Sequence, residues 1–218
     1  MICGVDEAGK GPVLGPLVVA GVCFSDEEKI NTLGVKDSKK LSARRRTQYA
    51  KAIMQIASAT EILIIPASDI DDMRKVMTMN EIEVFSFYRV IKKLQPNLCY
   101  VDAADVNEKR FGREIGKRLP KKIEIISKHK ADDIFPIVSA ASILAKTCRD
   151  REIKKLEQIL QKRLKLPLGS GYPADPVTKK FLRTWVKKFK KLPPQTRKSW
   201  KTATNLLNEL TRKTLDDF

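Results

Sequence analysis

Two short apolar segments at the start of the chain, residues 1–5 and 17–24, constrain the fold more than any other feature. Both are rich in β-branched and apolar side chains, and a loop dense in glycine and proline, Gly9 to Pro16, separates them. Apolar runs of this length bounded by such residues are typical of β-strands. We therefore expect both segments to lie in one sheet.

Helical and strand-like patterns alternate through the next part of the chain. Ser42 can cap a helix over residues 43–57, because its hydroxyl can accept a hydrogen bond from an N–H of the first turn. Further strands are expected at 60–65, 98–102 and 122–126, and further helices at 68–76, 80–94, 107–118 and, continuous or interrupted, 133–164. Such an order predicts an α/β fold with a mixed sheet.

The composition changes after Lys165. A loop rich in proline and glycine is followed by basic amphipathic segments at 177–191 and 199–215. This change predicts two domains, an α/β domain over residues 1–165, in which any catalytic site would lie, and a basic helical C-terminal subdomain with its tail over 166–218.

Positive charge is concentrated in the last third of the chain. The 218 residues carry a formal net charge of +17 at pH 7, of which residues 151–218 contribute +12. A polyanion is the simplest partner, because basic side chains that bind phosphates release condensed counterions. The alternative is a solvated lysine-rich surface. Aromatic residues within the basic region favour nucleic acid, although Trp185 and Trp200 at helical positions are more often core residues.

Several classes of protein are excluded by composition. No apolar run reaches the roughly 18 residues that a membrane span requires, and no charged segment precedes an apolar stretch at the N-terminus. We expect a soluble, cytoplasmic protein that is monomeric.

Cysteine and histidine usage points the chemistry toward carboxylates. Cys3, Cys23, Cys99 and Cys148 lie far apart among apolar neighbours and are expected to be buried free thiols. His129 is the single histidine, so a multi-histidine zinc site is excluded. We expect His129 to lie at the surface, where it could modulate the nearby Asp132.

Four carboxylates lie where elements are predicted to begin or end. Asp6 and Glu7 follow the first strand, Asp102 ends another, and Asp132 precedes an apolar helix. Adjacent carboxylates repel each other unless a proton or a cation lies between them. The four could therefore bind hard cations, which prefer oxygen ligands.

Each carboxylate also has a simpler interpretation. Asp132 could be only a helix N-cap, Asp102 could be an ordinary loop residue with Asp105 equally well placed, and Glu7 could be solvated.

A set of motifs, in order and spacing, resembles the type 2 ribonucleases H, also called ribonuclease HII. The resemblance covers roughly residues 1–182. A weaker match, similar to the archaeal branch of the family, lies at Arg197-Lys198-Ser199-Trp200-Lys201-Thr202. The motifs are Asp6-Glu7-Ala8-Gly9-Lys10-Gly11, Asp37-Ser38-Lys39-Lys40-Leu41, Tyr100-Val101-Asp102-Ala103-Ala104-Asp105, Lys130-Ala131-Asp132 with Val138 to Lys146, and Gly169-Ser170-Gly171-Tyr172-Pro173.

This resemblance implies an RNase H-like fold, with a mixed five-stranded sheet flanked by helices and a helical C-terminal subdomain. It implies an endonuclease that hydrolyses the RNA strand of RNA–DNA hybrids and cleaves at ribonucleotides embedded in duplex DNA, giving 5′-phosphate and 3′-hydroxyl ends. The cofactors implied are two Mg²⁺ or Mn²⁺ ions per active site. Two such ions activate a water and stabilise the leaving oxygen, which requires carboxylates and no histidine.

The resemblance also assigns roles to individual residues. Asp6, Glu7, Asp102 and Asp132 match the catalytic, metal-binding carboxylates. The substrate-binding positions are Gly9, Lys10, Gly11, Lys39, Ser139 and Tyr172.

Some of these positions depart from the family pattern or have simpler interpretations. Lys10 replaces the arginine of a Gly-Arg-Gly segment that reads the ribose 2′-hydroxyl, and lysine lacks the bidentate geometry of arginine. Tyr172 matches a tyrosine that packs on the neighbouring deoxyribose, but it could be a loop aromatic packed on nearby prolines. Lys39 could be a surface charge, and Ser139 could face the core.

Two alternative functions remain open from the sequence. One is a non-catalytic basic nucleic-acid-binding protein, which is disfavoured because carboxylates facing phosphates weaken binding unless metals intervene. The other is a DNA-specific metal nuclease of the same fold.

The C-terminal tail carries a further hypothesis. Leu215 and Phe218 are spaced like the anchors of the short peptide with which replication and repair enzymes bind the sliding clamp. The tail departs from that motif, because Arg212 stands where glutamine is usual and there is one aromatic residue. The alternative is a frayed chain end.

Overall fold

The chain folds into two compact units that interleave along the sequence. The computed structural model describes residues 1–25, 34, 41–119 and 123–215. Unit 1 comprises Met1–Ala8, Val18–Ile64 and Met77–Cys148. Unit 2 comprises Gly9–Leu17, Ile65–Val76 and Arg149–Phe218. Because each unit is assembled from separate stretches, the predicted division at residue 165 stays a prediction.

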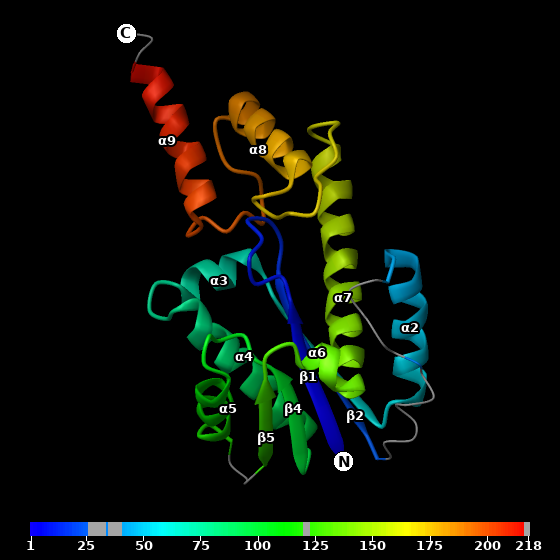
Figure 1. The fold of residues 1–218 in the computed structure, drawn as a ribbon. Helices are drawn as coiled ribbons and strands as arrows, with labels where there is room; N and C mark the ends of the chain where they lie inside the picture. Colours follow the sequence, from blue (N-terminus) through cyan, green and yellow to red (C-terminus); the bar gives the residue numbers. More distant parts are fainter. Residues whose placement is uncertain (26–33, 35–40, 120–122, 216–218) are drawn as a thin grey trace. The chain divides into compact units, whose positions relative to one another are not determined.

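Unit 1 is built on a five-stranded sheet in the order β3-β2-β1-β4-β5 (Figure 1). The central β1 pairs antiparallel with β2 and parallel with β4, and β4 pairs parallel with β5. The predicted mixed α/β sheet is confirmed, with its last strand two residues later than expected. The strands are β1 (Ile2–Ala8), β2 (Leu17–Phe24), β3 (Ala59–Ile65), β4 (Leu98–Asp102) and β5 (Glu124–Lys128).

Three helices of unit 1 begin at side-chain caps, of which the Ser42 cap was predicted from the sequence. The Ser42 hydroxyl accepts a hydrogen bond from the Arg45 N–H, and Thr78 and Glu81 form a reciprocal capping box. These caps set the starts of α2 (Ala43–Ile56) and α4 (Met79–Leu94), and α5 (Glu108–Gly116) begins after the Asn107 cap.

The predicted long helix is interrupted at Phe135. α6 (Ala131–Ile134) ends there, and α7 (Pro136–Gln161) starts with a proline. Phe135 has an extended backbone, with φ −112° and ψ 113°. A residue before proline is pushed out of the helical region, while proline itself is well suited to the first helical position. The proline at position 136 therefore explains why the helix is interrupted at Phe135.

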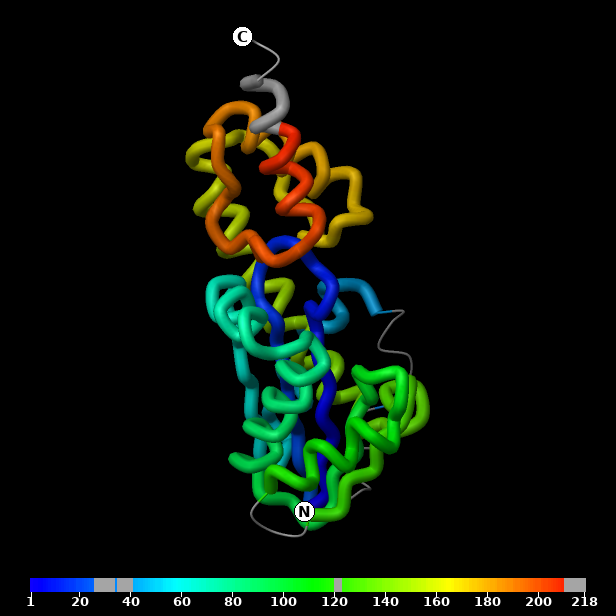
Figure 2. The backbone as a smooth tube through the Cα atoms, turned by 90° about the vertical axis from the view of Figure 1, so that its left-hand side faces the viewer, coloured from blue at the N-terminus to red at the C-terminus, as the bar shows by residue number. Residues whose placement is uncertain are grey.

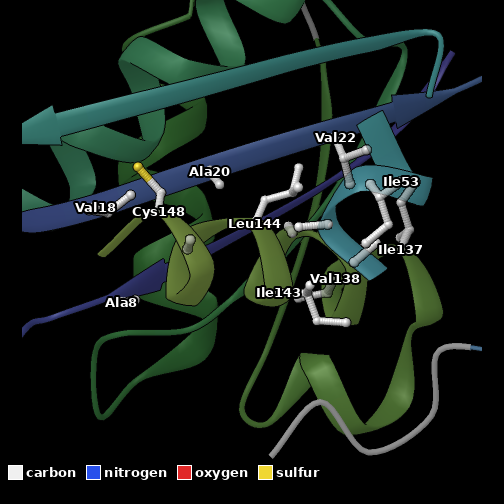
Figure 3. Packing of buried hydrophobic residues seen from close by; sticks show 14 of the residues in the cluster. Ala8, Val18, Ala20, Val22, Ile53, Ile137, Val138, Ile143, Leu144 and Cys148 are labelled. Atoms are coloured by element: carbon white, nitrogen blue, oxygen red, sulfur yellow. The ribbon is translucent and has the colours of Figure 1, made fainter. Parts of the chain in front are cut away.

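One hydrophobic cluster of unit 1 lies between α7, α2 and the strands β1 and β2. Figure 3 shows Ile137, Val138 and Leu144 of α7 among side chains of these strands and of α2. Gly4 of β1 permits close approach, because a Cβ there would overlap the Ile137 carbonyl. This packing fixes the first half of α7 against the strand that carries Asp6 and Glu7.

Unit 2 is helical, as predicted for the C-terminal part. It contains α3 (Ala67–Met73), the end of α7, α8 (Pro176–Phe189) and α9 (Lys201–Leu215). Its core includes Val13, Phe181 and Trp185, and Trp185 is fully buried. Segment 9–17 lies beside segment 195–200 (Figure 2), joined by an isolated bridge between Leu14 and Thr196. In the described part of the chain, no helix is long and apolar enough to span a membrane.

The prediction of four free thiols is wrong for one pair. Cys3 and Cys23 are opposite each other in the β1–β2 ladder, with Cα atoms 4.1 Å apart, and form a disulfide. Sequence spacing carried no sign of this pair, because strand register brings the two residues together. Cys99 and Cys148 are buried free thiols, as expected.

Candidate active site

Asp6 and Asp102 occupy the same edge of the sheet of unit 1. In the parallel ladder Val5 pairs with Val101, so Asp6 and Asp102 follow at equivalent positions on neighbouring strands. Asp6 is only 4% exposed, whereas Glu7 and Asp102 are half-buried. Carboxyl ends of parallel strands meet at one edge, and this topology brings together the first two carboxylates that the sequence predicted.

Asp132 reaches the same region through α6. The Ala131 N–H donates a hydrogen bond of 2.9 Å to Oδ1 of Asp102, which ties the start of α6 to the end of β4. Asp132 is the second residue of this helix and is buried, whereas the N-cap position belongs to Lys130. The interpretation of Asp132 as a simple N-cap is therefore wrong.

The electrostatics of Asp6 show that negative charge is crowded here. Burial, then the charges of Asp102 and Glu7, raise the pKa of Asp6 from 3.8 to about 8, although hydrogen bonds from Ser142 and from the Glu7 N–H oppose the rise. Lys146 adds positive charge to this region, with Nζ 3.9 Å from Oδ2 of Asp132 and 2.7 Å from the Ser142 hydroxyl. A second cation would let these carboxylates ionise together.

The donor set fits a hard divalent cation in chemistry and in charge. Carboxylate oxygens are the ligands that Mg²⁺ and Mn²⁺ prefer. Among the described residues, however, no three aspartate, glutamate, histidine or cysteine side chains are close enough to bind one ion as they stand. Mg²⁺ usually takes one or two carboxylates and completes its shell with waters and substrate phosphates, so the carboxylates present still fit it.

Asp105, the other candidate after β4, has a structural role. Its carboxylate accepts hydrogen bonds from Nε and Nη2 of Arg110, at 2.8 and 2.5 Å, and one from the Asn107 N–H at 3.1 Å. Such a bidentate pair holds the β4–α5 connection. The structure thus distinguishes Asp102, beside Asp6, from Asp105.

The predicted substrate-binding turn, Gly9-Lys10-Gly11, lies in unit 2. Gly9 has φ +101°, and a Cβ there would overlap the Pro16 carbonyl and the Arg149 side chain, so the position requires glycine. A Cβ on Gly11 would lie 3.6 Å from Cε1 of Tyr172. The Tyr172 ring is 40% exposed and stacks with Arg149, whose Cζ is 5.1 Å from the ring centroid. The turn and Tyr172 are therefore neighbours.

The remaining predicted positions are placed as follows. Ser139 is 1% exposed and its Oγ has no partner among the described residues, which favours its alternative interpretation as a core residue. His129 is exposed, as expected of a surface histidine. Lys39 and Phe218 lie outside the described residues, and Leu215 is the last residue of α9.

Four residues near the predicted positions were given no role from the sequence. They are Ser142 and Lys146, beside the carboxylates, and Arg149 and Arg197, which contact Tyr172 or the predicted substrate-binding turn. Three of the four fall within the motifs that carried the family resemblance, at 138–146 and 197–202. Trp200, which the sequence favoured as a core residue, donates a hydrogen bond to the Gly11 carbonyl of the turn.

The sheet order and the carboxylates at the ends of β1 and β4 define a nuclease of the RNase H-like fold. Residues 3–203 match the sequence model of the family described as Ribonuclease HII, and the chain belongs to that family. It is accordingly a ribonuclease H, an endonuclease of a family that depends on divalent metal ions.

Archaeal relatives support the assignment along the whole chain. A Ribonuclease HII from Methanothrix thermoacetophila is 48% identical over 208 residues, covering 94% of this chain and 97% of the relative. The ribonuclease H2 of Pyrococcus horikoshii has a TM-score of 0.88 at 38% identity, with 97% and 99% of the two chains covered. The Archaeoglobus fulgidus chain from a PCNA:RNase HII complex has a TM-score of 0.87 at 43% identity, with both chains fully covered.

Proposed function

We propose that this enzyme hydrolyses the RNA strand of RNA–DNA hybrids and also cleaves at single ribonucleotides embedded in duplex DNA, leaving 5′-phosphate and 3′-hydroxyl ends. Asp6, Glu7, Asp102 and Asp132 form its catalytic site. The observation that carries the proposal is that Asp6 is buried beside Asp102 and Glu7, so that burial first and then these two charges raise its pKa to about 8. A site built only for structure would avoid this unfavourable charge.

The proposed cofactors are two Mg²⁺ or Mn²⁺ ions, held by the four carboxylates. When bound, such ions lower the pKa of a bound water and stabilise charge on the leaving 3′-oxygen. The side chains around them orient the ligands: the Ser142 hydroxyl hydrogen-bonds to Asp6 and accepts a hydrogen bond from Lys146. Lys146 also offers positive charge beside Asp132 to a phosphate of the substrate.

Recognition of RNA is proposed to use the turn Gly9-Lys10-Gly11. Only Ala8 separates this turn from Glu7, so the turn directly continues the strand that carries Asp6 and Glu7. The ribose 2′-hydroxyl distinguishes RNA from DNA and is displayed in the shallow minor groove of an A-form-like duplex. Tyr172 beside the turn is proposed to pack on the deoxyribose next to the ribonucleotide, and Lys39 to contact a phosphate.

The exposed basic side chains of α8 are proposed to hold the duplex. Lys179, Lys180 and Arg183 are exposed, while Phe181 and Trp185 of the same helix are buried. The aromatic residues of this helix therefore serve the core of unit 2, and its affinity for nucleic acid comes from phosphate contacts.

We further propose that the tail binds a sliding clamp through Leu215 and Phe218. The Archaeoglobus fulgidus relative, similar along its full length, comes from a PCNA:RNase HII complex. Tethering to the clamp would raise the local concentration of the enzyme at sites of replication. Calorimetric titration of a 212–218 peptide into the clamp, beside a Leu215→Ala, Phe218→Ala control, tests this. Heat from the native peptide alone is expected; no heat at high micromolar concentration and no stimulation of the whole enzyme would overturn it.

One gel tests the main proposal. A labelled DNA duplex with one ribonucleotide is incubated with and without Mg²⁺, beside an all-DNA duplex and a long RNA–DNA hybrid. We expect Mg²⁺-dependent cleavage of the hybrid and of the single-ribonucleotide duplex, and none of the all-DNA control. Cleavage of the control would indicate a DNA nuclease, and binding without cleavage would indicate a non-catalytic protein.

A further inference from the structure

Arg197 is fully buried in unit 2 and binds the backbone of the loop that contains the substrate-binding turn. Its Nη2 donates to the Gly9 carbonyl at 2.6 Å, Nη1 to the Lys10 carbonyl at 2.8 Å and Nε to the Gly15 carbonyl at 3.1 Å. One guanidinium therefore holds two consecutive carbonyls of the turn and a third at the far end of the loop.

Trp200 completes this set of contacts. Its indole Nε1 donates a hydrogen bond of 3.2 Å to the Gly11 carbonyl, and its ring centroid is 4.8 Å from Cζ of Arg197. The carbonyls of Gly9, Lys10 and Gly11 are thus all bound by side chains from one short segment. That segment is itself paired with the loop, since the Arg197 N–H donates to the Val13 carbonyl at 2.9 Å.

These contacts fix the direction of the N–H groups in the turn. In a planar trans peptide the C=O and the N–H of the next residue point in opposite directions. Because Arg197 binds the carbonyls of Gly9 and Lys10, the N–H groups of Lys10 and Gly11 point away from the guanidinium. The third peptide group of the turn joins Gly11 to Pro12 and has no N–H. On the side opposite Arg197, the three peptide groups therefore present two donors, the N–H groups of Lys10 and Gly11.

The positive charge of Arg197, in addition to its geometry, affects these two N–H donors. A hydrogen bond from a cation polarises the peptide group that accepts it, and polarised groups strengthen each other along a chain of hydrogen bonds. A neutral residue could close the loop without the desolvation cost of a buried guanidinium. The choice of arginine therefore suggests a role in ligand recognition.

We propose that Arg197, supported by Trp200, is a positioning residue that sets the preference of this enzyme for a ribose. It aims and polarises the N–H groups of Lys10 and Gly11 toward the 2′-hydroxyl of the substrate. This inference rests on the proposed function of the turn.

The test compares two tryptophan variants that differ in one hydrogen bond. Trp200→Phe keeps a ring beside Arg197 but removes the donor to Gly11. Trp185→Phe is the matched control, because Nε1 of the buried Trp185 has no partner among the described residues. Arg197→Lys is the second variant, since a single ammonium cannot reproduce the planar contacts of the guanidinium.

The measured quantity is the ratio of dissociation constants for an all-DNA duplex and for the same duplex with one ribonucleotide. Binding is followed in Ca²⁺, with a gel to verify that the substrate stays intact, and melting temperatures are recorded in parallel. Trp200→Phe is expected to lower the ratio about three- to tenfold, the worth of one hydrogen bond, with unchanged affinity for all-DNA duplex. Arg197→Lys should lower it further, and Trp185→Phe should leave it unchanged.

Two outcomes would contradict the inference. An unchanged ratio in Trp200→Phe and in folded Arg197→Lys would show that the two residues only stabilise unit 2. If Arg197→Lys fails to fold, Trp200→Phe alone decides. A wild-type enzyme that binds both duplexes equally would overturn the proposed role of the turn itself, and this inference with it.

Discussion

Asp102 accepts a hydrogen bond from the backbone N–H of Ala131, at 2.9 Å, across 29 positions of sequence. This bond joins the last residue of β4 to the first residue of α6 and so brings Asp132 to the sheet edge that carries Asp6. A main-chain donor supplies the link, so this part of the site is assembled by the fold itself. An asparagine at position 102 could accept the same bond.

The first prediction separates Asp102 from Asp105. Asp102→Asn should keep the fold and lose at least about 100-fold in cleavage rate, because an amide is a poor ligand for a cation shared with phosphate. Asp105→Asn should lower stability by about 1–2 kcal/mol through its weakened pair with Arg110, with activity close to wild type. Cleavage rates and urea denaturation measure both, and the reverse pattern would exchange the roles of the two residues.

The second prediction concerns Asp175, which caps α8 and accepts hydrogen bonds from the N–H and hydroxyl of Ser170, both at 2.7 Å. The Ser170 and Val177 bonds lower the pKa of Asp175 from 3.8 to about 2. Below pH 3.8 the unfolded state takes up the proton first, so this stabilisation is present above pH 3.8 and is lost as the pH falls toward 2.

Asp175→Asn can still cap the helix but loses the charge of these hydrogen bonds, so it should reduce stability at pH 7 by about 1 kcal/mol and remove that part of the acid dependence. Urea denaturation at a series of pH values compares the two proteins. Their unfolding free energies should converge between pH 4 and pH 2, and a constant difference over that range would refute the assignment.

The third prediction concerns selectivity through Tyr172. Tyr172→Ala should reduce cleavage at an RNA–DNA junction about tenfold more than cleavage within continuous RNA, since the lost apolar contact is worth about 1–2 kcal/mol. Tyr172→Phe, which keeps the ring over Gly11, should behave like wild type. Single-turnover rates on the two substrates measure the effect, and equal losses on both would mean that the ring only supports its loop.

The fourth prediction places duplex binding on α8. Truncation from Val177 is a poor test, because it would remove Phe181 and Trp185 from the core of unit 2. Substitution of Lys179, Lys180 and Arg183 by glutamine should instead lower the slope of log K against log salt by up to about 3, at about 0.9 for each lost phosphate contact on B-DNA.

The control for this experiment is a second triple variant, which removes the same number of positive charges from α4. Arg89, Lys92 and Lys93 are exposed there, and Lys93 pairs with Glu61. Their substitution by glutamine should leave the salt slope unchanged. Equal slopes in both triple variants would show that net charge, and no particular face of the protein, governs binding.

Much of the fold could be predicted because its signals are local. Ser42 marks the start of α2, and Pro136 explains both the end of α6 and the start of α7. The apolar runs of β1 and β4 end where the carboxylates begin, so Asp6 and Asp102 could be identified as candidates from their positions.

The rest depends on contacts between distant segments, which leave no local pattern. Arg197 binds carbonyls more than 180 positions away, and although the motif at 197–202 includes it, no local pattern predicts these contacts. The Cys3–Cys23 pair depends on strand register, and the choice between Asp102 and Asp105 depends on Arg110 and Ala131. The family motifs marked these regions without saying what each residue contacts.

The most direct test of the central claim, that the carboxylate cluster around Asp6 binds divalent metal and hydrolyses RNA, is the single-turnover rate on a single-ribonucleotide duplex across Mg²⁺ concentrations. Asparagine has the shape of a protonated aspartic acid, so Asp6→Asn should fold with an unchanged or higher melting temperature in EDTA. The account predicts Mg²⁺-dependent cleavage by wild type and none above about 1% of that rate by Asp6→Asn, even at saturating Mg²⁺. Near-native cleavage by folded Asp6→Asn would contradict it.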